Sequence, residues 1–165
     1  MKKIGFHGGH TIYVLGSASD MKLFFDCISA YPAFDNKDMD WSLLTDRLYK
    51  RYLKFDELDQ ALALMHRVNE AFKQIPSNAV EWDRNIVGNA EKTLLNHELS
   101  TLADVFSKFF DSFYRAVSSA KSFYNTFKIY QPVKIIPTDT IYLMMEEKRP
   151  LKEYDELDGK PFWLR

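Results

Sequence analysis

The hydrophobic and polar positions near the N-terminus first follow the two-residue period of strands. Residues 4–7 and 11–15 are β-branched and aromatic runs, and Gly8-Gly9 lies between them. Glycine tolerates the positive φ of a tight turn, so this pattern predicts a β-hairpin. Gly16 marks the end of the second strand.

A helical period follows the hairpin directly. Ser17, with Asp20 three residues later, resembles a capping box and places an acid in the first helical turn. One apolar stripe at helical spacing comes next, made of Phe24, Cys27, Ile28 and Tyr31. Pro32 closes this segment, so we expect a helix between Ser17 and Pro32.

Three further segments have the pattern of amphipathic helices. A short one spans residues 41–52, and a second runs from Asp56 to Ile75. The third carries a long apolar stripe from Leu99 to Phe127, which predicts one central helix. Residues 79–82 fit a short strand, and residues 83–96 have no clean period and are expected to form a loop.

Strand-like residues return after the central helix. Residues 128–131 and 133–136 surround Pro132, and residues 140–144 follow a turn at 137–139. Two or three of these strands are expected to join the N-terminal hairpin. The predicted fold is therefore α+β, with a small antiparallel sheet from both chain ends packed against three or four helices.

The chain fits one domain. Its 165 residues are enough to bury a core without disulfides or metal, and no repeat or composition shift marks a second domain. Residues 146–165 alternate in charge but end in Phe162-Trp163-Leu164, which is too apolar for a free tail. We expect this C-terminal extension to dock on the domain.

Composition narrows the class of protein and its location. Basic residues number 22 and acidic residues 23, so the broad positive field of a duplex-binding protein is missing. The single cysteine, Cys27, is predicted to be a buried small hydrophobe. No apolar run reaches the roughly 18 residues of a membrane span. The residues after Met1-Lys2-Lys3 lack the apolar region of a signal peptide, so we expect a cytoplasmic protein.

His7 and His10 bracket the glycine turn and raise a catalytic alternative. Two imidazoles across a hairpin would share a metal ion, and His7-Gly8-Gly9 is similar to the oxyanion loop of esterases. A zinc site needs further ligands, and the chain has neither a Gly-x-Ser-x-Gly motif nor a phosphate-binding loop. A small metal-dependent hydrolase stays an alternative, while the main prediction is a non-enzyme without a cofactor.

Aromatic residues make up 15% of the chain and raise a second alternative, a module for single-stranded RNA. RNA bases stack on exposed aromatic rings. The helical period places Tyr124 and Phe127 on the buried stripe of the central helix, and the remaining rings are not interleaved with a basic run. The pattern therefore favours core packing over base stacking.

Two acidic clusters lie beside a tryptophan and favour a protein partner. The first contains Asp35, Asp38, Asp40 and Trp41. The second, the stronger candidate, contains Glu153, Asp155, Glu156, Asp158 and Trp163. Aromatic anchors with a charged rim are typical of interfaces, and acidic groups speed association with a basic protein. We predict these residues as partner contacts, although a solvated charged face would leave the same pattern.

Several segments of the first half match a known order of motifs. They are the early strand, Leu15-Gly16-Ser17-Ala18-Ser19 leading into Phe24-Phe25, the Leu43–Leu53 helix with Tyr49 and Tyr52, and the long helix closed by Ala79-Val80-Glu81-Trp82-Asp83. In this order they resemble the immunity proteins of bacterial polymorphic-toxin and contact-dependent growth inhibition systems, in particular immunity protein family 70. After Asp83 only the order of a loop and the Leu102–Val117 helix is shared, and the tail from Glu146 extends beyond the pattern.

This resemblance implies a function by binding. Such proteins act as cytoplasmic antidotes that bind a cognate toxin domain, commonly a nuclease, and block its active site or an essential surface. The expected partner is therefore the C-terminal domain of a toxin, held in a tight protein–protein complex. Direct contact with nucleic acid or with a membrane is not expected.

Overall fold

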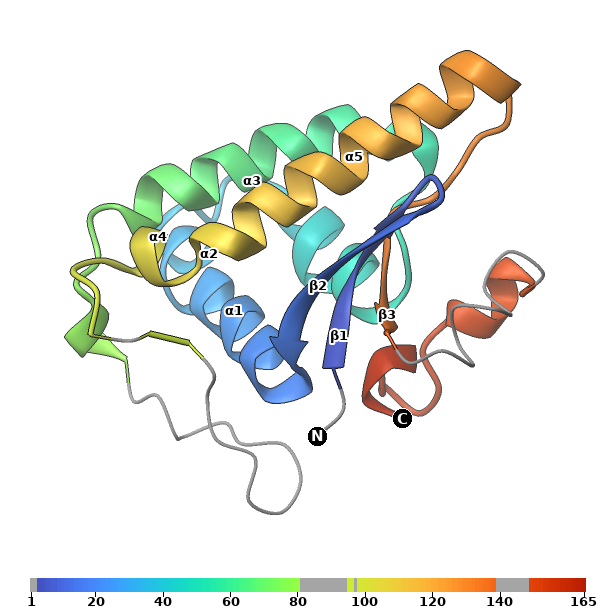
Figure 1. The fold of residues 1–165 in the computed structure, drawn as a ribbon. Coiled ribbons are helices and arrows are strands. Elements are labelled where there is room, and N and C mark those ends of the chain that lie inside the picture. The colour runs from blue at the N-terminus through green and yellow to red at the C-terminus, as the bar shows by residue number, and fades with distance from the viewer. Residues whose placement is uncertain (1–2, 81–94, 97, 139–148) are drawn as a thin grey trace.

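The computed structural model describes residues 3–80, 95–96, 98–138 and 149–165 (Figure 1). Within them, a three-stranded antiparallel sheet packs against five α-helices, two of which are single turns. The predicted α+β class is confirmed, and so is a small antiparallel sheet drawn from both halves of the chain. The number of helices exceeds the prediction because hydrophobic periodicity does not reveal single turns.

The sheet joins the N-terminal hairpin to one strand from the second half of the chain. Strands β1 (Lys3–Gly8) and β2 (Thr11–Ser17) form the predicted hairpin. Strand β3 (Lys134–Pro137) pairs antiparallel with the other edge of β1. The order is therefore β2-β1-β3, which makes β1 the central strand and buries it from Ile4 onward.

The other predicted C-terminal strands are not part of this sheet as described. Residues 128–131 form an exposed loop, because Lys128 adopts a left-handed conformation with φ 57° that ends the preceding helix. Pro132 then has no N–H to donate to a neighbouring strand. The predicted strand at 140–144 lies outside the described residues.

Local sequence signals determine where the first two helices begin. Helix α1 (Ala18–Ala30) begins where the sequence predicts, because the Ser17 hydroxyl accepts a hydrogen bond from the Asp20 N–H at 3.1 Å. Helix α2 (Pro32–Asp35) follows almost at once. Its first residue is proline, which suits the first helical turn because the N–H there has no helical partner.

The next segments keep the predicted places but not always the predicted type. Leu43–Leu48 winds as a π-helix within the expected 41–52 segment. Helix α3 (Leu58–Phe72) lies inside the predicted Asp56–Ile75 helix and is preceded by a 3₁₀ turn. Ser77–Ala79 forms another 3₁₀ turn, and the rest of the strand expected at 79–82 falls largely outside the described residues.

The predicted central helix is two helices. The Thr101 hydroxyl accepts the Asp104 N–H, so α4 (Leu102–Val105) begins three residues after Leu99. The helical backbone is interrupted at Phe106, and α5 (Ser107–Phe127) follows. The interruption turns the chain so that α5 lies across the sheet beside α3 (Figure 1).

The core is built around the ring of Phe24 on α1. Five other rings lie with their centroids 5.1–6.1 Å from it: Phe25, Phe72, Phe106, Phe109 and Phe110. The ring of Phe6 on β1 meets Phe113 of α5 edge-on at 5.5 Å, which joins the sheet to this cluster. Cys27 is buried as predicted, and burial raises the pKa of its thiol to about 12.

The hairpin turn presses directly on α5. Gly9 has a φ of +60°, which favours glycine, and its backbone approaches Ser119. A Cβ at Gly8 would overlap the carbonyl oxygen and carbon of Ala116, both backbone atoms of α5. The two glycines therefore allow the hairpin and the helix to pack backbone against backbone.

Replacing Gly8 with alanine should destabilise the fold by about 2 kcal/mol or more, because helix and strand must separate to admit a methyl group. Gly16→Ala is the matched control, since a Cβ there meets only the Asp20 carboxylate at 3.5 Å. Urea unfolding of both variants measures the difference. Equal stabilities would show that the close packing at Gly8 does not matter.

Candidate functional site

The structure places the two histidines that bracket the glycine turn in different environments, one buried and one exposed. His7 is 5% exposed and pairs with Ile12 on one side and with Lys134 on the other. His10 lies on the exposed turn. Its ring meets the ring of Phe123 edge-on, with the two centroids 4.4 Å apart. Among the described residues, no three or more His, Cys, Asp or Glu side chains gather where they could hold a metal ion.

The buried histidine is electrically neutral at physiological pH. Burial lowers the pKa of His7 to about 3, and the nearby Lys134 and His10 add to the effect. The Nδ1 atom has no hydrogen-bond partner within the described residues. His7 therefore behaves as a packed imidazole whose protonation the fold opposes.

This opposition predicts a pH-dependent stability. In the unfolded chain His7 binds a proton below its ordinary pKa of 6.5, whereas the folded chain binds it only near pH 3. The neutral His7 therefore contributes fully to the free energy of unfolding above pH 6.5. Between pH 6.5 and about pH 3 that free energy falls by about 1.4 kcal/mol per pH unit. Denaturant unfolding at several pH values should show that His7→Gln removes this slope. His66→Gln, on the surface, should keep it, and an unchanged slope in His7→Gln would refute the assignment.

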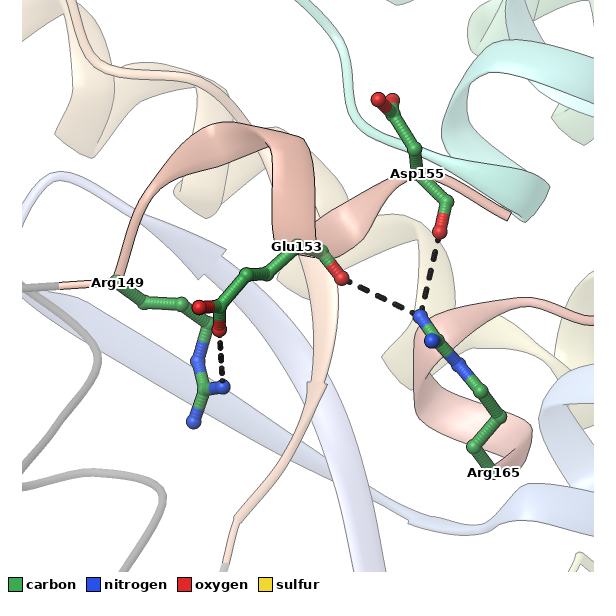
Figure 2. A network of polar contacts seen from close by, with 4 residues as sticks. All are labelled: Arg149, Glu153, Asp155 and Arg165. Atoms are coloured by element: carbon green, nitrogen blue, oxygen red, sulfur yellow. Dashed lines mark hydrogen bonds and ion pairs between the residues drawn. The ribbon is translucent and has the colours of Figure 1, made fainter. Parts of the chain in front are cut away.

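Two of the four carboxylates in the second acidic cluster are paired with cations of the chain itself, one of them in the network of Figure 2. The Arg149 guanidinium donates to the Glu153 carboxylate at 2.8 Å, and Glu156 lies 3.6 Å from the Lys50 ammonium. Arg165 donates to the backbone carbonyls of Glu153 and Asp155, both at 3.3 Å. Cations thus offset much of the charge that the sequence assigns to a partner surface.

The remaining carboxylates of this cluster stay exposed. Figure 2 shows the Asp155 side chain pointing away from Arg165, which binds only its backbone carbonyl. Asp158 lies on an exposed turn with φ 53°. Of the four acids predicted here, two therefore face solvent and have no ion-pair partner among the described residues.

Both predicted tryptophan anchors are buried, which corrects their expected role as surface contacts. Trp163 is 2% exposed, and its indole N–H donates to the Tyr49 carbonyl at 2.8 Å. Trp41 is 7% exposed, and its indole N–H donates to the Asn36 carbonyl at 2.9 Å. Each indole fills the core and satisfies its polar atom internally, so neither presents a ring to a partner.

The burial of Trp163 fastens the C-terminal segment to the domain, as expected from its apolar end. Trp163→Ala should cost about 3–5 kcal/mol in unfolding free energy, because a large cavity opens and a carbonyl loses its donor. Phe34→Ala, at a 62% exposed ring, should change stability by less than about 0.5 kcal/mol. Chemical denaturation of both variants tests this, and a mild effect at Trp163 would contradict the docked arrangement.

The first acidic cluster forms an open surface, here called the acidic loop and defined as residues 34–40. Asp35, Asp38 and Asp40 are all exposed, and Lys37 is the only cation between them, which leaves two net negative charges. Phe34, at the end of α2, is 62% exposed, and the Lys37 ammonium lies 4.6 Å from its ring centroid. An exposed aromatic ring and three carboxylates thus share one short segment.

Internal hydrogen bonds and the buried Trp41 indole hold the acidic loop in shape. The Asn36 carbonyl accepts from the Trp41 indole and also from the Met39 N–H at 3.2 Å. The Asn36 side chain donates to the Pro32 carbonyl at 2.9 Å. These bonds tie the loop to the start of α2 and to the buried indole, so Trp41 positions the loop rather than contacting a partner.

The Asp40 carboxylate is fixed in its charged form. It accepts hydrogen bonds from the Ser42 hydroxyl and, at 3.0 Å, from the Ser42 N–H. These bonds, the hydroxyl bond first, lower the pKa of Asp40 below its usual value. The loop therefore keeps this negative charge across the neutral pH range.

A shallow pocket lies between the acidic loop and α3. Its volume is about 320 Å³, and its lining includes Met39 and Asn36 from the loop and Arg67 and Glu70 from α3. A neighbouring groove of about 490 Å³ runs between α3 and α5 and shares His66 with it. The surface beside the loop is thus concave and of mixed charge.

Sequence reasoning missed two exposed aromatic features. Phe34 belongs to no periodic stripe, and the sequence shows only an aromatic residue followed by the polar residues 35–38. Phe127 is 57% exposed although the helical stripe predicts burial, and Tyr124 is only partly buried. The stripe fails there because the C-terminal end of α5 projects beyond the hairpin tip, where the sheet no longer covers it (Figure 1).

Comparison with protein-family models, with curated proteins and with solved structures found no match to this chain. The helices within the described ranges include none with the length and apolar character needed to cross a membrane. The acidic loop is the most distinctive exposed surface described above.

Proposed function

We propose that this chain is a cytoplasmic immunity protein that binds and neutralises a toxin domain, with the acidic loop as its main contact surface. The observation that carries the proposal is the exposure of Phe34 beside Asp35, Asp38 and Asp40. Interfaces of high affinity combine a large aromatic anchor with charges around it. The resemblance of the first half of the chain to immunity proteins supports the same function.

The charge of the loop specifies the kind of toxin surface. A nuclease binds its substrate through cations that neutralise phosphates. Three carboxylates held on a short, hydrogen-bonded segment complement such a surface, and they accelerate association by electrostatic steering. The proposed toxin is therefore a nuclease whose basic substrate-binding face receives the loop.

The loop is already shaped for binding. Trp41 and Asn36 fix its backbone, so little conformational freedom is lost when a partner docks. Asp155 and Asp158 have exposed side chains and fit a secondary contact at most, because their neighbours Glu153 and Glu156 already bind cations of this chain. The proposal assigns the chain no catalytic residue and no cofactor.

Co-expression tests the function itself. The partner to use is the C-terminal domain of a large secreted protein encoded next to this chain. Rescue of growth, together with co-purification of an equimolar complex, is the expected result. Continued toxicity without any complex would refute the proposal.

Charge reversal tests the acidic loop. Asp35→Lys together with Asp38→Lys should slow association with the toxin domain about tenfold or more at low salt and flatten its salt dependence. Phe34→Ala should speed dissociation by about tenfold, as expected for an anchor. Surface plasmon resonance over a range of salt concentrations measures both rates.

The matched control changes the net charge equally at a distance from the loop. Asp155→Lys and Asp158→Lys reverse two exposed carboxylates of the C-terminal segment, which Figure 1 places away from α2. This pair should slow association much less than the loop pair. Equal slowing would show that overall charge, and not the acidic loop, governs recognition.

A further inference from the structure

The C-terminal end of α5 carries a second exposed surface, which the proposed function does not use. We call it the aromatic end, and its members are Phe55, Phe123, Tyr124, Phe127, Ile129 and Tyr130. Three of them are strongly exposed within four consecutive residues: Phe127 at 57%, Ile129 at 52% and Tyr130 at 66%. A contiguous exposed apolar patch on a folded domain marks an interaction surface.

The rings of the aromatic end are ordered by contacts among themselves. Tyr130 stacks on Tyr124 with an interplanar angle of 15° and centroids 4.6 Å apart, and Phe55 lies 4.9 Å and 5.1 Å from these two rings. On the other side, Phe123 lies 4.8 Å from Phe127 and 4.4 Å from the ring of His10. Rings held in this way lose little entropy on docking.

The backbone turns at Lys128 to complete the surface. Lys128 has a φ of 57°, a left-handed conformation that a residue other than glycine adopts at a cost of about 1 kcal/mol. Its N–H donates to the Tyr124 carbonyl at 2.7 Å, which closes the helix. The turn brings the ring of Tyr130 onto that of Tyr124 before the chain continues to β3.

The charges around the aromatic end select the partner. Lys54 and Asp56 flank Phe55, Lys128 lies between Phe127 and Ile129, and none of these three has an ion-pair partner among the described residues. A nucleic acid would require a uniformly basic rim, and a basic protein an acidic one. A rim with both signs is complementary to itself, because a two-fold axis places the cation of one copy opposite the acid of the other.

We propose that the aromatic end is a two-fold dimer interface, with a second copy of this chain as its occupant. Tyr130 and Phe127 form the apolar centre, and Lys128 of each copy faces Asp56 of the other. Figure 1 places α2 near the start of α5 and the aromatic end at its finish, so dimerisation leaves the acidic loop of each copy free. The proposal does not rest on the proposed function.

Sedimentation velocity on the purified chain, across a wide range of concentrations, tests the dimer without any toxin. A species of twice the 19.4 kDa chain mass is expected. Tyr130→Ser and Phe127→Ser should each raise the dimer dissociation constant tenfold or more, while circular dichroism shows the fold intact. Phe34→Ser removes an equally exposed ring elsewhere and should leave the dimer unchanged.

A charge exchange tests the two-fold geometry. Lys128→Asp and Asp56→Lys should each weaken the dimer, and the two together should restore it. A monomer at all concentrations, or a dimer that Tyr130→Ser leaves intact, would overturn the proposal. It would also be overturned if the chain stayed monomeric and bound oligouridine in a manner that depends on Tyr130, since the surface would then stack bases.

Discussion

The ring of Phe24 is the interaction on which the rest of the structure depends. Its five aromatic neighbours come from α1, α3, the break at Phe106 and the start of α5. One side chain therefore joins three helices. Ring pairs of this kind add attraction beyond the burial of their area. The cluster fixes the direction of α5, and that direction decides which surfaces the fold leaves exposed.

The two candidate surfaces follow from where this helix ends. Over the sheet, α5 contacts the hairpin backbone at Gly8 and the ring of Phe6, and its apolar stripe is buried there. Toward its C-terminal end the same stripe is covered only in part, by His10 of the turn and by Phe55, which creates the aromatic end. The acidic loop has a different origin: the buried indole of Trp41 binds the Asn36 carbonyl and holds three carboxylates outward.

Local signals in the sequence predicted most of the fold. The hairpin, the Ser17 cap and α3 depend on neighbours a few residues apart, and they lie where expected. The break at Phe106 and the exposure of Phe127 depend on what packs above each residue, which periodicity does not record. Likewise, charge patterning found both acidic clusters, but the contacts of Trp163 with Tyr49 and of Glu156 with Lys50 span most of the chain and were not predictable.

Hydrogen–deuterium exchange of the chain with and without the proposed toxin domain tests the central claim most directly. The account predicts slower exchange at the amides of residues 35–41, together with little change at residues 149–165. Protection confined to the C-terminal segment, with the acidic loop exchanging as in the free protein, would contradict it.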